Sequence, residues 1–376
     1  MESIILVSNT SWYLYNFRLS IIKLFQQQGY HVICIANRDD YSDKLVKEGV
    51  EFIQSEVDNK GTNPVNDFKY FLYLRKKYKK IKPVFIFHYT VKPNIYGGWA
   101  AKVAGIPSIA IVSGAGYAFL EKNLLHQIVK RCYRLAAWCC REMWFVNVDD
   151  LKMFLDAKIV PERKTKVLPG EGIDTDKFSR STPYPVDNKD FIFMLSARLL
   201  WDKGVGVYVE AAREIKKTYN NVRFQLLGFI DNQNPSAISR EQVTEWENEG
   251  VIEYLGVTDN VMQYLMRINC FVLPSYYREG VPRALLEAAS LEIPIITTDN
   301  VGCREVVKEG YNGVLCRLKD PHDLAEKMAG FLQTDKQKLA VMGRNGRAKV
   351  IAELHEQMVL KFYREALEEI RQGIHH

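Results

Sequence analysis

The sequence lacks the glycine-rich signatures of the common nucleotide-binding folds. Neither a G-x-G-x-x-G nor a G-x-x-x-x-G-K-[ST] pattern occurs where an expected strand meets a helix, so dinucleotide-binding and P-loop functions lose their main support. The seven cysteines form no C-x-x-C pair, and the seven histidines are dispersed. We therefore expect no metal ion and no bound cofactor.

The sequence also lacks any apolar run long enough to cross a membrane. Its scattered, odd number of cysteines is typical of reduced thiols in the cytosol. We expect a cytoplasmic protein, and any contact with a membrane would be peripheral, on the inner face of the cytoplasmic membrane.

Acidic residues are absent from Phe68 to Leu120, a stretch with nine Lys and Arg residues. Residues 1–178 hold 26 Lys/Arg and 18 Asp/Glu, a net of +8, whereas the whole chain carries +6. We therefore expect the first half of the chain to bind an anionic partner. A basic amphipathic helix over Phe68–Lys82 fits an anionic membrane surface. Nucleic acid is the competing partner, but no helix-turn-helix, RRM or zinc module supports it.

The 376 residues, 47% of them hydrophobic, suffice for two domains. Short β-branched runs alternate with helical patterns throughout, which predicts an α/β fold with parallel sheets. The expected strands of the first series are Ile4–Val7, Val32–Ala36, Val84–Phe87, Ile109–Val112 and Trp144–Val146. Those of the second are Phe191–Leu195, Val222–Leu227, Val251–Leu255, Cys270–Leu273, Ile293–Thr297 and Gly313–Leu315.

Proline and turn-forming residues interrupt this alternation between the two series. We expect a first Rossmann-like domain over 1–170, a linker over 171–190 and a second Rossmann-like domain over 191–355. A C-terminal helix over 356–376 is expected to pack back toward the first domain. Two such domains facing across a cleft place ligands at the carboxyl ends of the strands.

The first motif with chemical meaning follows the first strand of the second domain. It reads Ser196-Ala-Arg-Leu-Leu-Trp-Asp-Lys-Gly204, and it places Arg198 and Lys203 beside a helix start. Two cations next to helix amides make a site for a diphosphate. From spacing alone, two solvated surface cations are an equally good interpretation.

The second motif follows the strand that ends at Leu273. Glu279 and Gly280 lie in its loop, Pro282 opens a helix, and Glu287 follows eight residues after Glu279. Glycine lets the backbone approach a ligand. Glu287 has apolar neighbours, where an unpaired carboxylate is costly, and hydrogen bonds from ribose hydroxyls would offset that cost. The alternative is a solvated helix carboxylate. A weaker third motif, Val301-Gly-Cys-Arg-Glu305, follows the next strand.

Together these motifs resemble the retaining GT-B glycosyltransferases of family 4, over nearly the whole chain. The resemblance implies that Arg198 and Lys203 bind the donor diphosphate, that Glu279 contacts the donor sugar and that Glu287 holds the ribose. Arg198, Lys203 and Glu279 would be catalytic. The resemblance also assigns Gly280, Val281 and Pro282 to the donor site.

A narrower resemblance rests on Tyr15-Asn-Phe-Arg18, Leu227-Gly228 and Tyr254-Leu-Gly256. These look like PglA-type bacterial N-acetylgalactosaminyltransferases, which extend undecaprenyl-diphosphate-linked sugars. Gly228 and Tyr254 then join the donor site. The acceptor set that this resemblance suggests is Asn16, Arg18, His88, Lys92, Ser113 and Gly114. The chain departs from the wider family at Val112-Ser-Gly114, where many members have a histidine, and His88 is the nearest substitute or simply a structural histidine.

The sequence thus predicts a retaining glycosyltransferase that binds acceptor on the first domain and donor on the second. It would move an N-acetylhexosamine, with N-acetylgalactosamine favoured, from a nucleotide-sugar (UDP) donor to a lipid-linked saccharide acceptor. This step would belong to the assembly of bacterial surface polysaccharide or glycan. The alternatives are a GT-B-fold nucleotide-sugar epimerase or hydrolase, and a non-catalytic sugar-nucleotide-binding scaffold.

Overall fold

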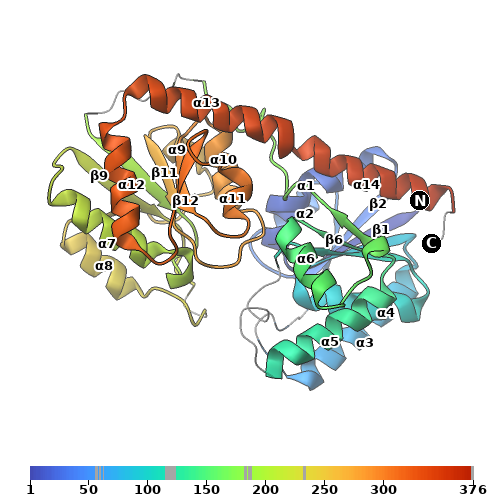
Figure 1. Cartoon of the computed structure of the whole chain (residues 1–376). Coiled ribbons are helices and arrows are strands. Elements are labelled where there is room, and N and C mark those ends of the chain that lie inside the picture. The colour runs from blue at the N-terminus through green and yellow to red at the C-terminus, as the bar shows by residue number, and fades with distance from the viewer. Residues whose placement is uncertain are drawn as a thin grey trace. The chain divides into compact units, whose positions relative to one another are not determined.

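The computed structural model describes residues 1–55, 58, 61, 63–114, 124–181, 184, 189–231 and 234–373. The chain divides into two compact units (Figure 1). Unit 1 comprises Met1–Gly172 and Glu356–His376, and unit 2 comprises Ile173–His355. Each unit is a parallel β-sheet between layers of helices, as the alternating pattern predicts.

Unit 1 has a seven-stranded sheet in the order β3-β2-β1-β4-β5-β6-β7, with every pair parallel. The strands are β1 Ser3–Thr10, β2 His31–Asn37, β3 Glu51–Gln54, β4 Phe85–Tyr89, β5 Ser108–Val112, β6 Glu142–Phe145 and β7 Thr165–Val167. Both faces are buried because alternate residues feed different cores: Ile4 and Leu6 pack on one side, Ile5 and Val7 on the other.

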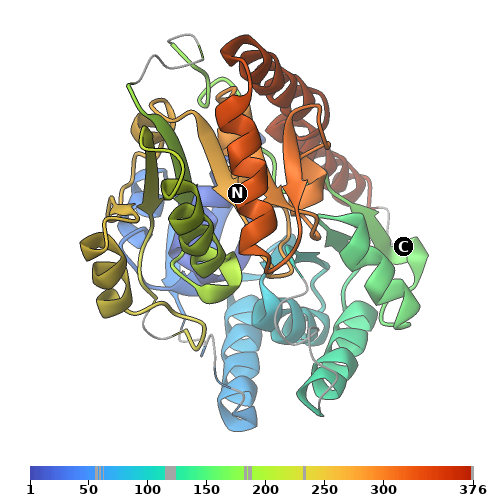
Figure 2. The same ribbon diagram turned by 60° about the vertical axis from the view of Figure 1, so that its left-hand side comes forward.

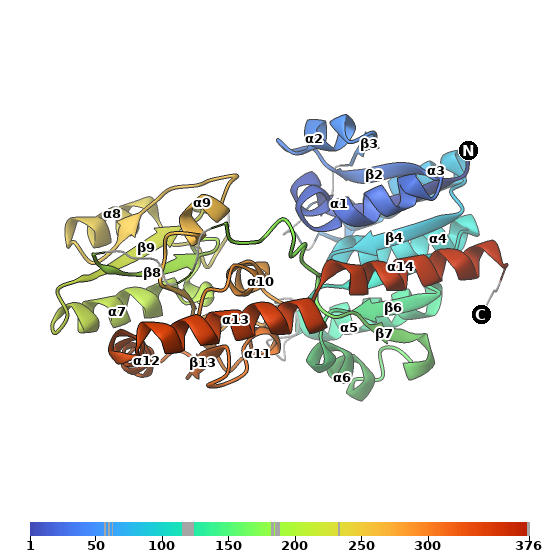
Figure 3. The same cartoon turned by 90° about the horizontal axis from the view of Figure 1, so that it is seen from above.

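Helices cover both faces of this sheet. Helices α1 and α14 pack on the face that contains Ile4 and Leu6, and Figure 3 shows them along it. Helices α3 to α6 pack on the opposite face. The bounds are α1 Ser11–Gln27, α2 Ser42–Lys47, α3 Pro64–Ile81, η1 Pro93–Gly97, α4 Gly98–Ala104, α5 Leu124–Cys139, α6 Val148–Asp156, η3 Glu162–Lys164 and α14 Glu356–Arg371.

Unit 2 has a six-stranded parallel sheet in the order β10-β9-β8-β11-β12-β13. The strands are β8 Phe191–Ser196, β9 Val222–Leu227, β10 Glu253–Tyr254, β11 Cys270–Leu273, β12 Ile295–Thr298 and β13 Gly313–Cys316. The helices are η4 Trp201–Lys203, α7 Val205–Lys216, α8 Arg240–Asn248, α9 Met262–Leu265, α10 Arg283–Ser290, α11 Cys303–Val306, α12 Pro321–Gln333 and α13 Lys336–Glu353. Helices α7, α8 and α12 cover one face, and Figure 2 shows α7 beside α12. Helices α9, α10, α11 and α13 cover the other.

The structure differs from the sequence-based expectation in two places. Strands β3 and β7 were not predicted, because both are short edge strands that lack a long apolar run. The expected linker over 171–190 is also wrong for much of its length. Ile173 and Phe178 lie in one core of unit 2, and Tyr184 lies in the other. Helix α13 ends at Glu353 and α14 begins at Glu356, at the start expected for the C-terminal helix.

The chain passes between the units twice, at Gly172–Ile173 and at His355–Glu356. The two passages are adjacent. Ile173 pairs with His355 in an isolated β-bridge, and its N–H donates to the Leu354 carbonyl over 3.2 Å. On the unit 1 side, a Cβ added to Gly172 would lie 2.9 Å from the Cα of Glu356.

Candidate functional site

The predicted donor residues gather at the carboxyl edge of the unit 2 sheet. Arg198 and Lys203 follow β8, Gly228 follows β9, and Glu279 follows β11. Because all these strands are parallel, their carboxyl ends meet at one edge, where ligands bind in open α/β sheets. The structure thus brings together residues that lie as far as 81 positions apart in the sequence, from Arg198 to Glu279.

A tight ion pair joins the two main motifs. Lys203 Nζ lies 2.5 Å from Glu279 Oε1, and the Ser275 hydroxyl donates to the same oxygen over 2.9 Å. Both partners are largely buried, with 15% and 9% of their side chains exposed. Glu279 therefore has a fixed orientation. Sequence reasoning missed Ser275, although its position two residues after the end of β11 could have indicated it.

Backbone contacts hold the loops of this edge against each other. The Asp202 carbonyl accepts from the N–H groups of both Tyr276 and Tyr277 over 3.0 Å. On the other side, a Cβ on Gly302 would lie 1.9 Å from the Gly280 carbonyl oxygen. Since Gly302 also has a φ of +78°, only glycine fits there. The weak third motif therefore has a structural role: it lets β12's loop close on the loop of Glu279.

Arg198 is the open member of the cluster. Its side chain is 43% exposed, and its Nη1 lies 3.7 Å from Asp231 Oδ2. Burial raises the pKa of Asp202, while the charges of Lys203 and Arg198 lower it and that of Glu279 raises it. These four ionisable groups therefore sense one another electrostatically. Asp202 is a further member that sequence reasoning did not single out.

Glu287 lies on the first turns of α10, after Pro282. The structure corrects the view that it lacks a charged partner: Arg283 Nε donates to Glu287 Oε1 over 3.0 Å. Burial still raises the pKa of Glu287, and Arg283 opposes that shift. The i, i+4 spacing of the pair on a helix was the available signal. Val281 and Pro282 are buried, and Pro282 is the N-cap of α10 rather than its first residue.

Gly228 and Tyr254 lie together at the end of β9. The Tyr254 hydroxyl donates to the Gly228 carbonyl over 2.8 Å. A Cβ on Gly228 would lie 1.7 Å from the Ala197 carbonyl oxygen, at a φ of +148°. Glycine at this position therefore lets the β9 loop lie against the loop that carries Arg198.

The structure corrects the expected acceptor role of Arg18. Its side chain is fully buried and forms an ion pair with Glu171, just before the chain leaves unit 1. The Arg18 guanidinium also lies over the rings of Tyr13 and Tyr89, 5.0 and 4.6 Å from their centroids. A side chain without exposed surface does not reach an acceptor. Sequence reasoning missed Glu171, which is 153 positions away in the chain.

Three acceptor candidates lie near this buried pair or on its helix. The Tyr13 hydroxyl accepts from Arg18, and it lies 3.2 Å from Ser113 Oγ and 3.3 Å from Glu171 Oε1. Ser113 and Gly114 follow the carboxyl end of β5 and are partly exposed. Asn16 on α1 donates from its side chain to the Trp12 carbonyl over 2.9 Å.

His88 and Lys92 both make internal contacts. His88 is fully buried in β4, with Nε2 3.0 Å from the Tyr78 hydroxyl, and a Cβ on Gly97 would lie 2.4 Å from its ring. The structure therefore removes His88 from the acceptor set, because its ring has no exposed surface. Lys92 Nζ forms a 2.6 Å ion pair with Asp67, and 14% of its side chain is exposed. A small part of the Lys92 side chain is therefore accessible to an acceptor.

We expect His88 to make the stability of unit 1 fall in acid. Burial lowers the pKa of His88 to about 3, whereas an unfolded histidine titrates near 6.5. The unfolded state therefore binds more protons between these values. The contribution is complete above pH ~6.5, and it decreases by about 1.4 kcal/mol per pH unit as the pH falls toward 3. In urea denaturation between pH 7 and 5, His88→Gln should flatten this slope.

The exposed His322 provides the matched control for this experiment. Its hydrogen bond to Glu214 raises the pKa of His322, so its contribution has the opposite sign. His322→Gln should leave the acid-induced loss of stability in place. An unchanged slope in His88→Gln would show that His88 titrates normally.

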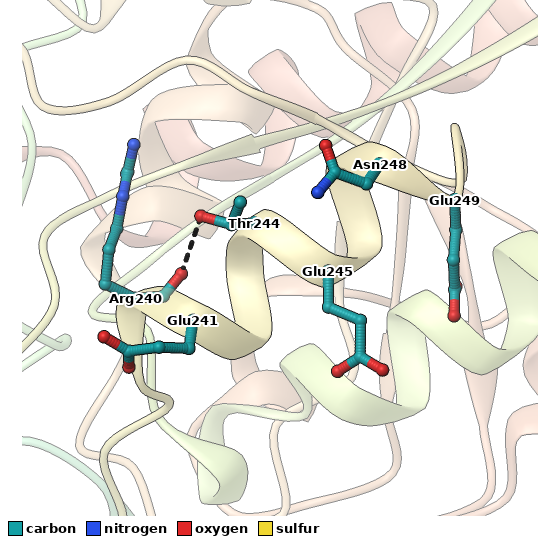
Figure 4. A pocket seen from close by; sticks show the side chains of 6 residues that line it. All are labelled: Arg240, Glu241, Thr244, Glu245, Asn248 and Glu249. Carbon is teal, nitrogen blue, oxygen red and sulfur yellow. Dashed lines mark hydrogen bonds between the residues drawn. The ribbon is translucent and has the colours of Figure 1, made fainter.

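A hollow elsewhere on unit 2 contains none of the predicted site residues. It lies over α8 and is lined by Arg240, Glu241, Thr244, Glu245, Asn248 and Glu249 (Figure 4). All six come from one helix and the residue that follows it, and the Thr244 hydroxyl donates to the Arg240 carbonyl. A hollow on a single helix brings no separate loops together, so we do not assign it a role.

Within the described part of the chain, no group of three or more His, Cys, Asp or Glu side chains is arranged to hold a metal ion. None of its helices combines the length and the hydropathy that a membrane span needs.

The fold matches solved GT-B glycosyltransferases over the whole chain. HepE from Anabaena superposes with a TM-score of 0.78 at 16% identity, covering 98% of this chain and all of the other. WaaG, a glycosyltransferase of lipopolysaccharide biosynthesis, superposes with a TM-score of 0.69 at 15% identity, covering 92% and 94%. These likenesses establish the GT-B class of fold.

The sequence relationship is closer and defines the family. Residues 176–349 match the model "Glycosyl transferases group 1", and residues 3–139 match "Glycosyl transferase 4-like". A Campylobacter jejuni protein is 32% identical over 87% of this chain and 88% of its own length. It is named N,N'-diacetylbacillosaminyl-diphospho-undecaprenol alpha-1,3-N-acetylgalactosaminyltransferase. An Escherichia coli UDP-Gal:alpha-D-GlcNAc-diphosphoundecaprenol alpha-1,3-galactosyltransferase is 26% identical over 76% of each chain. The chain belongs to the family that these two models describe, the group 1 and family 4-like glycosyltransferases, and it is itself a glycosyltransferase. This relationship confirms the resemblance seen in its motifs.

Proposed function

We propose that this glycosyltransferase moves an N-acetylhexosamine from a UDP-sugar to a saccharide linked to undecaprenyl diphosphate. N-acetylgalactosamine is the favoured sugar, and bacterial surface polysaccharide or glycan assembly is the favoured process. One observation carries the proposal: the similarity, over 87% of this chain, to the Campylobacter jejuni enzyme, whose name gives both the transferred sugar and the lipid-linked acceptor. The E. coli relative, a galactosyltransferase, also acts on a diphosphoundecaprenol-linked sugar by name.

Unit 2 is proposed to bind the donor. The HepE structure is a complex with UDP, which is a nucleoside diphosphate with two acidic phosphates. Arg198, exposed at the carboxyl edge, and Lys203 supply positive charge for such a diphosphate. Glu287, next to the N-terminal turn of α10, would accept hydrogen bonds from the ribose hydroxyls. Gly228, Tyr254, Gly280, Val281 and Pro282 would shape the walls of this site.

The proposed reaction retains the configuration at the anomeric carbon. The bond between this carbon and the UDP oxygen breaks, and a bond to the acceptor oxygen forms on the same face. The acceptor's proton passes to the departing phosphate oxygen. Lys203 and Arg198 stabilise the negative charge that develops on UDP. Glu279, held through Oε1 by Lys203 and Ser275, would orient the donor sugar with Oε2. We propose that these cations make a metal ion and other cofactors unnecessary.

Unit 1 is proposed to bind the acceptor, with Asn16, Lys92, Ser113 and Gly114 as the remaining candidates. An undecaprenyl chain resides in a bilayer, so the enzyme would act at the cytoplasmic surface of the membrane, attached peripherally. We propose no nucleic acid partner.

The release of UDP from a panel of UDP-sugars, with and without the lipid-linked acceptor, tests this function. We expect the release of UDP to depend on the acceptor and to persist in the presence of a chelator. NMR should show that the product has the same anomeric configuration as the donor. Turnover without acceptor would instead indicate an epimerase or hydrolase. Binding of UDP-sugar without turnover would indicate a scaffold.

A further inference from the structure

The outer face of one helical layer of unit 1 exposes large apolar side chains. Helices α3, α4 and α5 pack on the same face of the sheet. Trp138 is 67% exposed and Phe68 59%, although both are large aromatic side chains. We call the set the α3–α5 face; its exposed apolar members are Val65, Phe68, Leu72, Val103, Ile128, Leu135 and Trp138. Scattered apolar residues are ordinary on a surface, but seven on three adjoining helices indicate an interaction surface.

The spacing of these residues places them on the solvent side of each helix. On α3, Val65, Phe68 and Leu72 follow the i, i+3, i+7 rule, while Tyr70, Leu74 and Tyr78 face the core. On α5, Ile128, Leu135 and Trp138 are spaced i, i+7, i+10, which also places them on one side of the helix. Helices α3 and α5 therefore each pack one apolar face on the sheet and expose a second apolar stripe to solvent.

Contacts among the helices hold α3, α4 and α5 side by side. The Lys102 ammonium of α4 lies 5.4 Å from the ring centroid of Trp138 on α5. Tyr96 in η1 donates to Asp67 of α3 over 2.8 Å. Burial raises the pKa of Tyr96 and of Cys132 on α5, and Asp67 raises the pKa of both further. Figure 2 shows α3 and α5 on either side of α4.

The charge of the α3–α5 face has one sign. Its exposed cations are Lys69, Lys76, Lys79, Lys80, Lys102, Arg131 and Arg134. Among the described residues of α3, α4 and α5 the one acidic side chain is Asp67, which is buried and bound by Lys92. Cations therefore surround the apolar side chains of the α3–α5 face, and the described residues of these helices include no exposed carboxylate.

We propose that the α3–α5 face docks on an anionic lipid bilayer, with Phe68, Trp138 and their apolar neighbours among the headgroups. Aromatic rings favour this interfacial depth, and lysine and arginine stems extend along it toward lipid phosphates. Nucleic acid would match the cations but leaves the apolar stripes unexplained. The inference rests on the proposed function in one respect: a lipid-linked acceptor requires the enzyme to act at the surface of a bilayer.

The location of the face suits that acceptor. Both α3 and α5 begin after the carboxyl ends of strands, β3 and β5, so Val65, Phe68 and Ile128 lie in the turns nearest that edge. Ser113 follows the end of β5 at the same edge of the sheet. A bilayer against the α3–α5 face would hold an undecaprenyl diphosphate close to the acceptor candidates.

Vesicle flotation with the full chain tests the docking without using enzymatic activity. We expect binding to vesicles of equimolar phosphatidylglycerol and phosphatidylcholine and little binding to phosphatidylcholine alone, with the affinity falling as salt rises. The double variant Phe68→Ser/Trp138→Ser should weaken binding by at least about tenfold. The triple variant Lys76→Gln/Lys79→Gln/Lys80→Gln should weaken it by roughly a hundredfold.

Matched controls come from exposed positions of unit 2. Val341→Ser/Ile351→Ser removes two exposed apolar side chains, and Lys217→Gln/Lys336→Gln/Lys338→Gln removes three exposed cations. Both should bind vesicles as the unmodified chain does. Unchanged thermal unfolding of the α3–α5 variants will show that they are folded.

The outcomes separate this inference from the proposed function. Vesicle binding that Phe68→Ser/Trp138→Ser leaves unchanged would overturn the docking surface, whatever the activity. Tighter binding to a single-stranded oligonucleotide than to anionic vesicles would do the same and favour nucleic acid. With docking correct, the aromatic variant should lose transfer to vesicle-embedded acceptor but keep it toward a short-chain, water-soluble acceptor. Inactivity of the unmodified chain on both acceptors would reject the proposed function and leave the vesicle result standing.

Discussion

Replacing Lys203 with methionine is expected to lower kcat for sugar transfer by at least about a hundredfold while leaving the chain folded. Lys203 is proposed to face the charge that develops on departing UDP, and loss of one such fixed donor commonly costs a factor of 100 to 1,000, roughly. Its ion pair with Glu279 adds a second effect, because methionine leaves that carboxylate with Ser275 alone. Steady-state release of UDP in the presence of acceptor measures the loss.

A double variant separates catalysis from stability at this pair. Lys203→Met leaves Glu279 poorly compensated, whereas Lys203→Met/Glu279→Gln removes both charges and should regain the stability that the single variant loses. It should not regain activity. Lys217→Met, an exposed lysine just after α7, is the matched control and should retain full turnover. Near-normal kcat in Lys203→Met would remove the proposed diphosphate role.

Replacing Arg18 with methionine is expected to destabilise unit 1 by about 3–5 kcal/mol. Removing one partner of a buried ion pair leaves the other charge uncompensated, and Glu171 is only 6% exposed. Arg18 also supplies the cation over Tyr13 and Tyr89. Urea denaturation, with amide hydrogen exchange to identify the unit 1 amides, measures the change.

Two comparisons make this prediction specific. Arg18→Met/Glu171→Leu, which replaces the pair with apolar side chains, should recover most of the stability. Arg38→Met, which breaks an exposed ion pair with Asp43 in the same unit, should cost less than about 1 kcal/mol. If Arg18→Met is no worse than Arg38→Met but raises the KM for the acceptor, the sequence-based acceptor role of Arg18 is restored.

The sequence was sufficient for the features that depend on local pattern. Alternating apolar runs and helices predicted both parallel sheets, and the position of each motif directly after a strand placed Arg198, Lys203 and Glu279 at the carboxyl ends of strands. The direct contact between Lys203 and Glu279 was not predictable. It requires the backbone bonds from Tyr276 and Tyr277 to Asp202, which position one loop on the other.

The predictions that failed concern residues whose contacts come from distant parts of the chain or are not indicated by the local sequence. The resemblance suggested an acceptor as the partner of Arg18, and nothing local in the sequence indicates that its partner is Glu171. His88 looked available at the end of its strand, but Gly97 and Tyr78 enclose it.

The adjacency of the two passages between the units has a topological consequence. Unit 2 is a contiguous insertion into unit 1, whose own ends, at Gly172 and Glu356, already touch. Adjacent ends are the condition under which domain insertion and circular permutation are tolerated. Truncation after residue 172 would still strip unit 1 of α14, whose Tyr363 and Leu360 fill its core. A short peptide joining 172 to 356 would instead give unit 1 as one continuous chain. Excising 173–355 would give unit 2 as a single segment.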